Sequence, residues 1–327
     1  MNTRRKIVTV LGAGIVVAPF RALAQQPAKV YRLAFLGASS AAGITTLTEA
    51  LRAGLREQGY FEGKNITIES RWADGKYERL PALAAELVAL KPDIIVAQAT
   101  SGALAAKQAT STIPIIMPSV TDPVANGLVT SLARPGGNVT GMTYFAPELA
   151  AKQIELLKET LPHSKKLAAL LNPDSPASAT QFRAMTATAA ALKIGLAPFE
   201  ARAPDDFPKA ISAMRANRFD GLVVMDDPVL YSNTSQIAEL VMKHRLPSSG
   251  FRELAEAGGL MAYGVNRHEM WRRVGIFVDK ILKGAKAGEL PIERATRFDM
   301  LVNLKTAKAL GIKVPQTIMI QATKVIE

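Results

Sequence analysis

From Val30 onward, short apolar runs alternate with longer stretches of helical periodicity, and this alternation constrains the fold most. The run "VYRLAFLG" precedes "TLTEALRAGLREQG", in which Leu47, Leu51 and Leu55 recur at helical spacing. The apolar runs "DIIVAQA" and "IPIIMPSV" follow, separated by the small-residue helix "SGALAAKQAT". Apolar strands that alternate with helices are typical of parallel sheets covered on both faces. The sequence therefore predicts an α/β fold with a doubly wound parallel sheet.

The alternation begins again after Thr143, which indicates a second lobe of the same kind. A helix in "ELAAKQIELLKETLP" leads to the strands "KLAALLN" and "GLVVMD", with two further helices and the run "LAPFEA" between them. "RHEMWRRVGIFVDKILKG" is strongly amphipathic, and "RFDMLVNLKTAKALGIKVP" adds a strand and a helix capped by Asn303. Because no Gly- or Ser-rich linker separates the halves, we expect a hinge of several crossovers. The predicted lobes are residues 29–143 with about 265–290, and residues 144–264 with about 291–327.

The first 24 residues have two competing interpretations. "VTVLGAG" resembles the start of a dinucleotide-binding unit, but the third small residue of G-x-G-x-x-G is missing and Pro19 interrupts the helix that should follow. The basic residues 4–6, the apolar residues 7–18 and the small-residue site 22–24 are instead typical of a secretory signal peptide. We expect residues 1–24 to be removed on export to the periplasm. The general and twin-arginine routes both stay open.

Charge and cysteine content narrow the function classes. The net charge is +12, but four basic residues lie in the first 24 positions, and without them 36 basic residues face 28 acidic ones. Those 36 are scattered on helix faces near acids, so nucleic acid is not an expected partner. The absence of cysteine excludes disulfides, zinc–thiolate sites and a cysteine nucleophile. No later apolar run approaches transmembrane length, so the mature chain is not expected to span a membrane.

The search for catalytic residues leaves few candidates. His163, His244 and His268 are far apart, and each has a helical or helix-end context typical of a surface or core histidine. Asp226 and Asp227 are adjacent at a strand end, where neighbouring side chains point in opposite directions and form a poor acid–base pair. G-x-S-x-G, HExxH, Walker and S-x-x-K motifs are missing. We therefore expect no enzyme, no cofactor and no metal site.

Polar side chains follow the strands of both halves, at the edge where open α/β sheets bind ligands. Each one alone is more often a helix cap or a turn residue, but together they favour a ligand cleft between the lobes. Hydroxyls near helix N-termini suit an anion such as a carboxylate. The polar candidates are Ser39, Ser40, Thr100, Ser101, Thr121 and Asp122 in the first half, and Asn172 and Asp226 in the second.

Aromatic residues supply the apolar part of a small-molecule site. Tyr144 and Tyr263 each end a strand at a predicted crossover, so we expect them at the cleft. The hinge would include Thr143, Tyr144, Tyr263 and Gly264, and Gly264 would absorb backbone rotation with little strain. Ligand binding would then favour the closed state, because only closure adds the contacts of the second lobe.

Two blocks, "TDPVANGLVTSLARPGGNVTGMT" and "NLKTAKALGIKVPQTIMIQATKVI", closely resemble the substrate-binding proteins of ABC transporters. The resemblance covers essentially the whole mature chain and is strongest to the branch linked to tryptophan and tyrosine. It implies a type I periplasmic-binding fold with three crossovers and a cleft that closes on its ligand. It also implies a permease and an ATPase on separate chains.

The resemblance also implies roles for individual residues. A ligand carboxylate would lie near Ser39, Thr100, Ser101 and Thr121. An ammonium group would face Asp226, with Asn172 nearby. Many relatives have a single Asp at this strand end, so either Asp226 or Asp227 would point inward.

The resemblance implies an extracytoplasmic, monomeric solute-binding component of an ABC importer. Its ligand would be small and polar, an amino acid or a related carboxylate, aromatic ones included. The alternative is a ligand-binding sensor subunit for a membrane receptor kinase, which would use the same two lobes. LacI-type repressors share the fold, but they begin with a DNA-binding helix pair, whereas this chain begins with an expected signal peptide.

Overall fold

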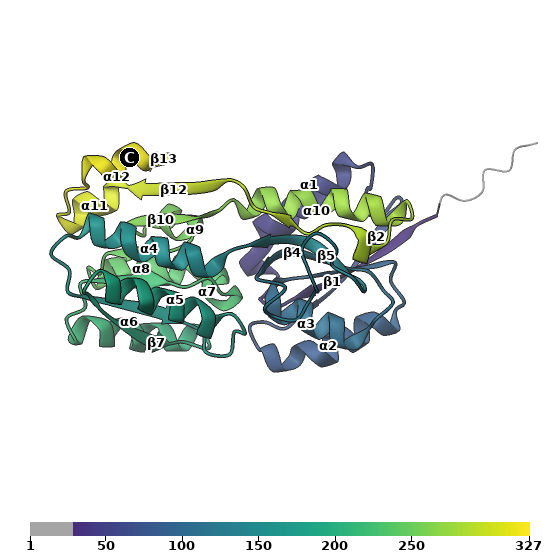
Figure 1. The fold of residues 1–327 in the computed structure, drawn as a ribbon, viewed down its shortest axis with the longest axis horizontal. Coiled ribbons are helices and arrows are strands. Elements are labelled where there is room, and N and C mark those ends of the chain that lie inside the picture. Colours follow the sequence, from purple (N-terminus) through teal and green to yellow (C-terminus); the bar gives the residue numbers. More distant parts are fainter. Residues whose placement is uncertain (1–28) are drawn as a thin grey trace, which may run out of the picture.

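The computed structural model describes residues 29–327. The expected signal peptide, residues 1–24, lies outside the described residues and stays a prediction. The described chain forms two lobes that lie side by side along the long axis of the molecule (Figure 1). Each lobe contains a parallel sheet with helices on both faces, which confirms the predicted α/β fold class.

The first lobe is built on a six-stranded parallel sheet in the order β11-β5-β4-β3-β1-β2. Helices α1 and α10 cover one face, and α2 and α3 cover the other. Side chains alternate accordingly along β1, where Leu33 and Phe35 face α1 and α10 while Ala34 and Leu36 face α2 and α3. The elements are β1 (Tyr31–Gly37), α1 (Thr45–Glu57), β2 (Ile66–Trp72), α2 (Leu80–Ala89), β3 (Ile94–Ala97), α3 (Ala99–Ala109), β4 (Ile115–Thr121), β5 (Val139–Tyr144), α10 (Arg267–Leu282) and β11 (Glu293–Arg294).

The second lobe contains a four-stranded parallel sheet in the order β7-β6-β8-β9. Beside it lies a three-stranded sheet, β10-β12-β13, in which β12 runs antiparallel to β10. The elements are α4 (Ala146–Thr160), β6 (Lys166–Leu171), α5 (Ser178–Ala191), β7 (Gly195–Glu200), α6 (Phe207–Ala216), β8 (Gly221–Val224), α7 (Pro228–Ser232), α8 (Thr234–Lys243), β9 (Ser248–Ser249), α9 (Arg252–Glu256), β10 (Met261–Val265), β12 (Phe298–Asn303), α11 (Leu304–Leu310), α12 (Gln316–Gln321) and β13 (Lys324–Ile326).

Three segments connect the lobes, as a multi-crossover hinge requires. They run from β5 to α4, from β10 to α10 and from β11 to β12 (Figure 1). Strand β11 pairs with β5, so the chain leaves the first sheet only after Arg294. Asn303 accepts a hydrogen bond from the N–H of Thr306 and caps α11, as its place in the sequence predicts. The exact limits of the two lobes stay a prediction.

Helices α1 and α10 pack closely because two glycines meet where they cross. A Cβ atom on Gly54 would lie 1.8 Å from the backbone oxygen of Arg272, and one on Gly275 would lie 2.2 Å from the backbone oxygen of Gly54. Neither position accepts a side chain unless the helices separate. This contact fixes α10 against the first lobe, and with it Arg267 and Trp271 near the start of the helix.

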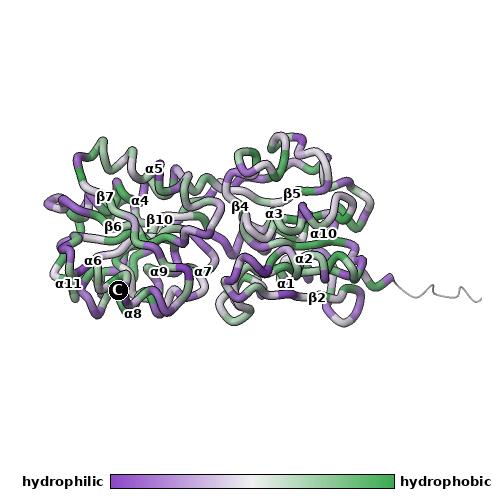
Figure 2. The backbone as a smooth tube through the Cα atoms, turned by 90° about the horizontal axis from the view of Figure 1, so that it is seen from below, coloured by the Kyte–Doolittle hydropathy of each residue, from purple (hydrophilic) through white to green (hydrophobic). Residues whose placement is uncertain are grey.

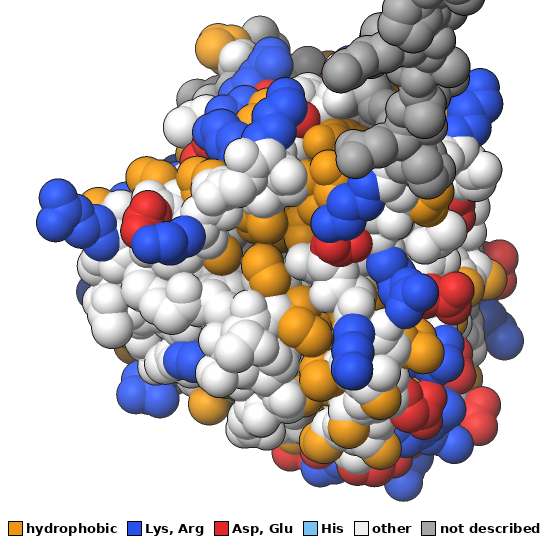
Figure 3. Space-filling model, turned by 90° about the vertical axis from the view of Figure 1, so that its right-hand side faces the viewer, with side chains coloured by type: hydrophobic (Ala, Val, Ile, Leu, Met, Phe, Trp, Pro, Cys, Tyr) orange, Lys and Arg blue, Asp and Glu red, His pale blue; other side chains and the backbone are white. Residues whose placement is uncertain are grey.

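The outer surface carries mixed charges. Arg52 contacts Glu49 at 3.1 Å and Glu62 at 2.8 Å, and Arg71 contacts Glu86 at 2.8 Å. Figure 3 shows Lys and Arg side chains interspersed with Asp and Glu on one end of the molecule. Figure 2 shows hydrophobic stretches running through the interior of both lobes. Within residues 29–327, every helix is too short or too polar to cross a membrane.

Candidate functional site

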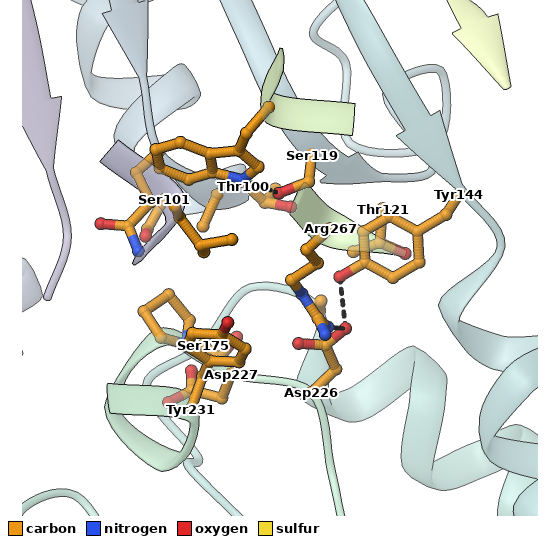
Figure 4. Close-up of a pocket in the computed structure, with 16 residues that line it drawn as sticks. Thr100, Ser101, Ser119, Thr121, Tyr144, Ser175, Asp226, Asp227, Tyr231 and Arg267 are labelled. Carbon is orange, nitrogen blue, oxygen red and sulfur yellow. Dashed lines mark hydrogen bonds and ion pairs between the residues drawn. The ribbon is translucent and has the colours of Figure 1, made fainter. Parts of the chain in front are cut away.

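A cavity of about 40 Å³ lies between the two lobes, as shown in Figure 4. Its walls come from the carboxyl ends of β3 and β4 in the first lobe and of β8 in the second, the edge where open α/β sheets bind ligands. The volume holds about three water molecules. A larger ligand would fit here only with the lobes further apart.

The first-lobe wall combines a helix start with hydroxyl groups. Ala99 begins α3 with a φ of 60°, a left-handed conformation that residues other than glycine rarely adopt. This conformation places Thr100 and Ser101 in the first helical turn, where both line the cavity. The first-turn N–H groups have no partners within the helix and carry its positive partial charge. Ser119 and Thr121 on β4 add two hydroxyls, so this wall suits an anion.

The side chain of Gln98 fixes the loop that follows β1 through hydrogen bonds to Ala38 and Ser39. Its Oε1 accepts hydrogen bonds from the N–H groups of Ala38 at 2.9 Å and Ser39 at 3.2 Å, and its Nε2 donates to the Ser39 hydroxyl at 3.0 Å. Ser39 is only 1% exposed, so its hydroxyl positions the loop rather than lining the cavity. Ser40 accepts a hydrogen bond from the N–H of Gly43 at 3.2 Å and also lies outside the lining.

Both acids after β8 line the cavity, but their surroundings differ. The Oδ1 of Asp227 accepts a hydrogen bond from the N–H of Val229 at 2.8 Å and one from Asn172 at 3.3 Å, while Tyr77 donates its hydroxyl to Oδ2 at 2.7 Å. Burial raises the pKa of Asp227 to about 6, although these hydrogen bonds favour the charged form. Because Tyr77 belongs to the first lobe, its hydrogen bond joins the two lobes.

Asp226 forms a buried ion pair with Arg267, and Tyr144 donates its hydroxyl to the same carboxylate at 2.6 Å (Figure 4). Burial disfavours the charge of Arg267, but Asp226, Tyr144, Glu253 and Tyr231 together outweigh this effect and raise the pKa of Arg267. Burial and the charge of Asp226 also raise the pKa of Tyr144 well above its usual value, so Tyr144 stays a hydrogen-bond donor. The Nη1 of Arg267 lies 3.8 Å from Glu253.

Aromatic rings form the apolar part of the lining. Trp271 is fully buried, and its Nε1 donates a hydrogen bond to Ser119 at 3.3 Å. The ring centroid of Phe35 lies 5.9 Å from that of Trp271, so the two rings pack against each other. Tyr231 in α7 and Tyr144 at the end of β5 complete the aromatic surface. The cavity therefore combines an anion-binding wall, two carboxylates that already have protein partners, and three aromatic side chains.

Half of the residues named from the sequence line this cavity. They are Thr100, Ser101, Thr121, Tyr144 and Asp226. Their contact with a ligand stays a prediction. Within residues 29–327, no cluster of His, Asp or Glu side chains is arranged to hold a metal ion.

The other residues named from the sequence lie nearby. Ser39 and Ser40 belong to the loop behind Gln98. Asp122 closes a turn, where its carboxylate accepts a hydrogen bond from the N–H of Ala125 at 3.0 Å. Asn172 contacts Asp227 rather than the cavity. Tyr263 stacks on Phe298 with ring centroids 6.1 Å apart and lines a smaller cavity of about 10 Å³ behind Arg267.

Several lining residues were not among those predicted. Arg267 and Trp271 lie one helical turn apart at the start of α10, immediately after the crossover from β10. Their signal was available, because a helix that begins at a crossover presents its first turns to the interlobe cleft. Ser119 and Gln98 gave no distinct signal, since a single polar residue in a buried strand or before a helix has many structural roles.

Comparison with known proteins assigns the family. The model of the family described as ABC transporter substrate binding protein matches residues 38–326. The chain belongs to this family. A tyrosine-binding protein of Clostridioides difficile (strain R20291) is 29% identical over 260 residues, which cover 79% of this chain and 74% of that protein. The resemblance drawn from the sequence is confirmed.

Two solved structures share the fold and differ in their ligand state. An ABC domain from Streptococcus pneumoniae in complex with L-Trp has a TM-score of 0.83, and the ligand-free, open structure of a substrate binding protein from Clostridium difficile has 0.62. Both are 26% identical and cover 91% of this chain, and the alignments span 100% and 99% of those chains. The fold of this chain therefore matches the L-Trp complex with a higher TM-score than it matches the ligand-free, open structure.

The family determines the general role of the protein. Substrate-binding proteins of ABC transporters act outside the cytoplasm, where they capture a small-molecule ligand for a membrane transporter. The predicted function, a solute-binding component of an ABC transporter, is confirmed at this level. The family favours transport over the alternative of a receptor-kinase sensor.

Proposed function

We propose that this protein captures a small carboxylate ligand with an aromatic part, an amino acid or a related acid, in the cleft between its lobes. The observation that carries the proposal is the composition of the cavity between the lobes. Hydroxyls and the start of α3 face it from the first lobe, while Asp226, Tyr231 and Trp271 supply charge and aromatic surface. The two relatives named above, one that binds tyrosine and one in complex with L-Trp, support the same ligand class.

The carboxylate would bind at the first turn of α3. This turn offers free N–H groups, the positive end of an 11-residue helix and the hydroxyls of Thr100 and Ser101. Thr121 is 6% exposed, so a hydrogen bond from its hydroxyl to the ligand would be shielded from water. The aromatic part would then lie against Trp271 and Tyr231.

Closure would couple ligand capture to delivery. Ligand bound to the first lobe gains the contacts of the second only when the cleft closes, so its binding energy favours the closed state. The hinge would lie at residues 143–144 and 263–264, next to two of the three crossovers. The cross-lobe contacts of Tyr77 with Asp227 and of Arg267 with Asp226 would form in the same step.

The family and the predicted signal peptide indicate where the protein would act and with which partners. Export through residues 1–24 would place the mature chain in the periplasm, where it would work as a monomer with a permease and an ATPase on separate chains. We assign it no enzymatic activity, no cofactor and no nucleic-acid partner.

A thermal-shift screen tests the proposal. Purified protein, freed of co-purified ligand, is heated with L-tryptophan, L-tyrosine, indole-3-propionate and 3-phenylpropionate. A ligand at about 100 times its Kd stabilises the folded state by about 2.7 kcal/mol. The matched control is 3-phenylpropan-1-ol, which keeps the ring and lacks the carboxylate. Stabilisation by at least one acid and none by the alcohol supports the proposal, whereas no shift with any acid refutes it.

A further inference from the structure

Arg267 is a buried cation at the centre of the cleft. It is the first residue of α10, a helix that packs against α1 in the first lobe, and it is only 5% exposed. Its guanidinium reaches across the cleft to Asp226 in the second lobe (Figure 4). Glu253 adds a second carboxylate 3.8 Å from Nη1. Asp226 therefore binds the guanidinium directly, whereas Glu253 lies near it without a hydrogen bond, and removing the guanidinium would leave Asp226 without its ion pair.

Aromatic rings surround the same guanidinium. Its central carbon lies 5.8 Å from the ring centroid of Tyr144, 5.1 Å from that of Tyr231 and 5.6 Å from that of Phe251. Rings at this distance attract a cation, and aromatic cages of this kind hold the ammonium groups of ligands in other proteins. In this cleft the guanidinium of Arg267 itself occupies the cation position among the rings.

The cavity has no free carboxylate for a second cation, such as the ammonium group of a ligand. Asp227 is 2% exposed, and its two oxygens accept hydrogen bonds from Tyr77, Asn172 and the backbone of α7. One oxygen of Asp226 is occupied by Arg267 and Tyr144. An ammonium group at the other oxygen would lie next to the guanidinium, and this repulsion would offset its attraction to Asp226. Burial would add a desolvation penalty.

The anion-binding side of the cleft carries no such conflict. Thr100, Ser101 and the first turn of α3 face the cavity opposite Asp226, and they offer a carboxylate hydroxyl and backbone N–H donors. We propose that the ligand is an aromatic carboxylic acid without an amino group, and that Arg267 determines this specificity by filling the ammonium position. The inference deepens the proposed function and rests on it.

Isothermal titration of matched acid pairs tests the inference. The pairs are 3-phenylpropionate with L-phenylalanine and indole-3-propionate with L-tryptophan, which differ only by the amino group. In wild-type protein, we expect the acid that lacks the amino group to bind at least tenfold more tightly in each pair that binds. Amino acids that bind equally well or better overturn the inference and leave the proposed function intact. No binding by any of the four refutes the proposed function, and the inference with it.

An Arg267→Met variant provides the second test. It keeps an unbranched side chain and frees Asp226, so we expect L-phenylalanine and L-tryptophan to gain at least tenfold in affinity relative to wild type. Arg267→Lys retains a cation and should keep the wild-type preference. The matched control is Arg272→Met, in the same helix but 60% exposed at its side chain and paired with Glu57 at the surface. An unchanged preference in a folded Arg267→Met variant overturns the inference, and if that variant does not fold, the wild-type pairs decide.

Discussion

The carboxyl of Asp227 makes the stability of this protein depend on pH in a predictable direction. Burial between the lobes raises its pKa from an ordinary 3.8 to about 6. Between these two values the folded protein binds a proton that the unfolded chain does not. The contribution of Asp227 to stability is therefore fully present below the unfolded pKa and is lost as the pH rises through the folded pKa.

The size of this effect follows from the shift. A rise in the pKa of Asp227 from 3.8 to about 6 changes the free energy of unfolding by about 3 kcal/mol over the whole titration, at about 1.4 kcal/mol per pKa unit. Between about pH 4 and pH 7, about 2 kcal/mol of it is lost. Other groups titrate in the same range, so the effect has to be isolated with Asp227→Asn, which preserves the shape and does not titrate.

Guanidinium unfolding followed by circular dichroism measures the effect. The free energy of unfolding is determined for wild type and Asp227→Asn at several pH values between 4 and 7. We expect wild type to lose about 2 kcal/mol relative to the variant as the pH rises over this range. Parallel curves would show that Asp227 is solvated, and would refute the account in which the lobes close over it.

Three further substitutions test other contacts. Tyr77→Phe removes the 2.7 Å hydrogen bond to Asp227 across the lobes, so ligand affinity measured by calorimetry should fall about tenfold, as expected for a hydrogen bond to a charged group. Thr100→Val removes a hydroxyl from the carboxylate site and should weaken acid binding by a similar factor, read in the same titration. Gly54→Ala places a Cβ atom 1.8 Å from the backbone oxygen of Arg272 and should lower the free energy of unfolding by about 1–3 kcal/mol.

Each substitution has a matched control elsewhere in the chain. Tyr31→Phe in β1 and Thr67→Val on the exposed edge strand β2 should leave ligand affinity unchanged. Gly195→Ala should be tolerated, because its Cβ atom would have no neighbour closer than 3.5 Å. Wild-type affinity in Tyr77→Phe would contradict the cross-lobe contact, and in Thr100→Val it would contradict the carboxylate site. Wild-type stability of Gly54→Ala would contradict the close helix packing.

The repeated strand and helix pattern made the fold predictable from sequence. Buried strands such as β3 and β4 are apolar throughout, and long helices such as α10 carry a clear apolar face. Five elements were not anticipated: α7, α9, α12, β11 and β13. Each has six residues or fewer, which is too short for a helical or strand periodicity to be recognised. Strand β11 forms by pairing with the edge of β5.

The site was only partly predictable, because local backbone geometry decides which side chain turns inward. The left-handed conformation of Ala99 brings Thr100 and Ser101 to the cavity, whereas Gln98 draws Ser39 away from it. The position of Arg267 at the cleft could have been inferred from the crossover, but its pairing with Asp226, 41 residues away in the chain and in the other lobe, could not. Such a pair exists only in the tertiary structure.

The central claim is that both lobes close on a carboxylate in this cleft. Hydrogen–deuterium exchange of the protein with and without a saturating acid, such as 3-phenylpropionate, tests it most directly. We predict slower exchange at the first-turn amides of α3 in one lobe and at those of α7 in the other, since both line the cavity. Protection confined to one lobe, or located away from the cleft, would contradict the account.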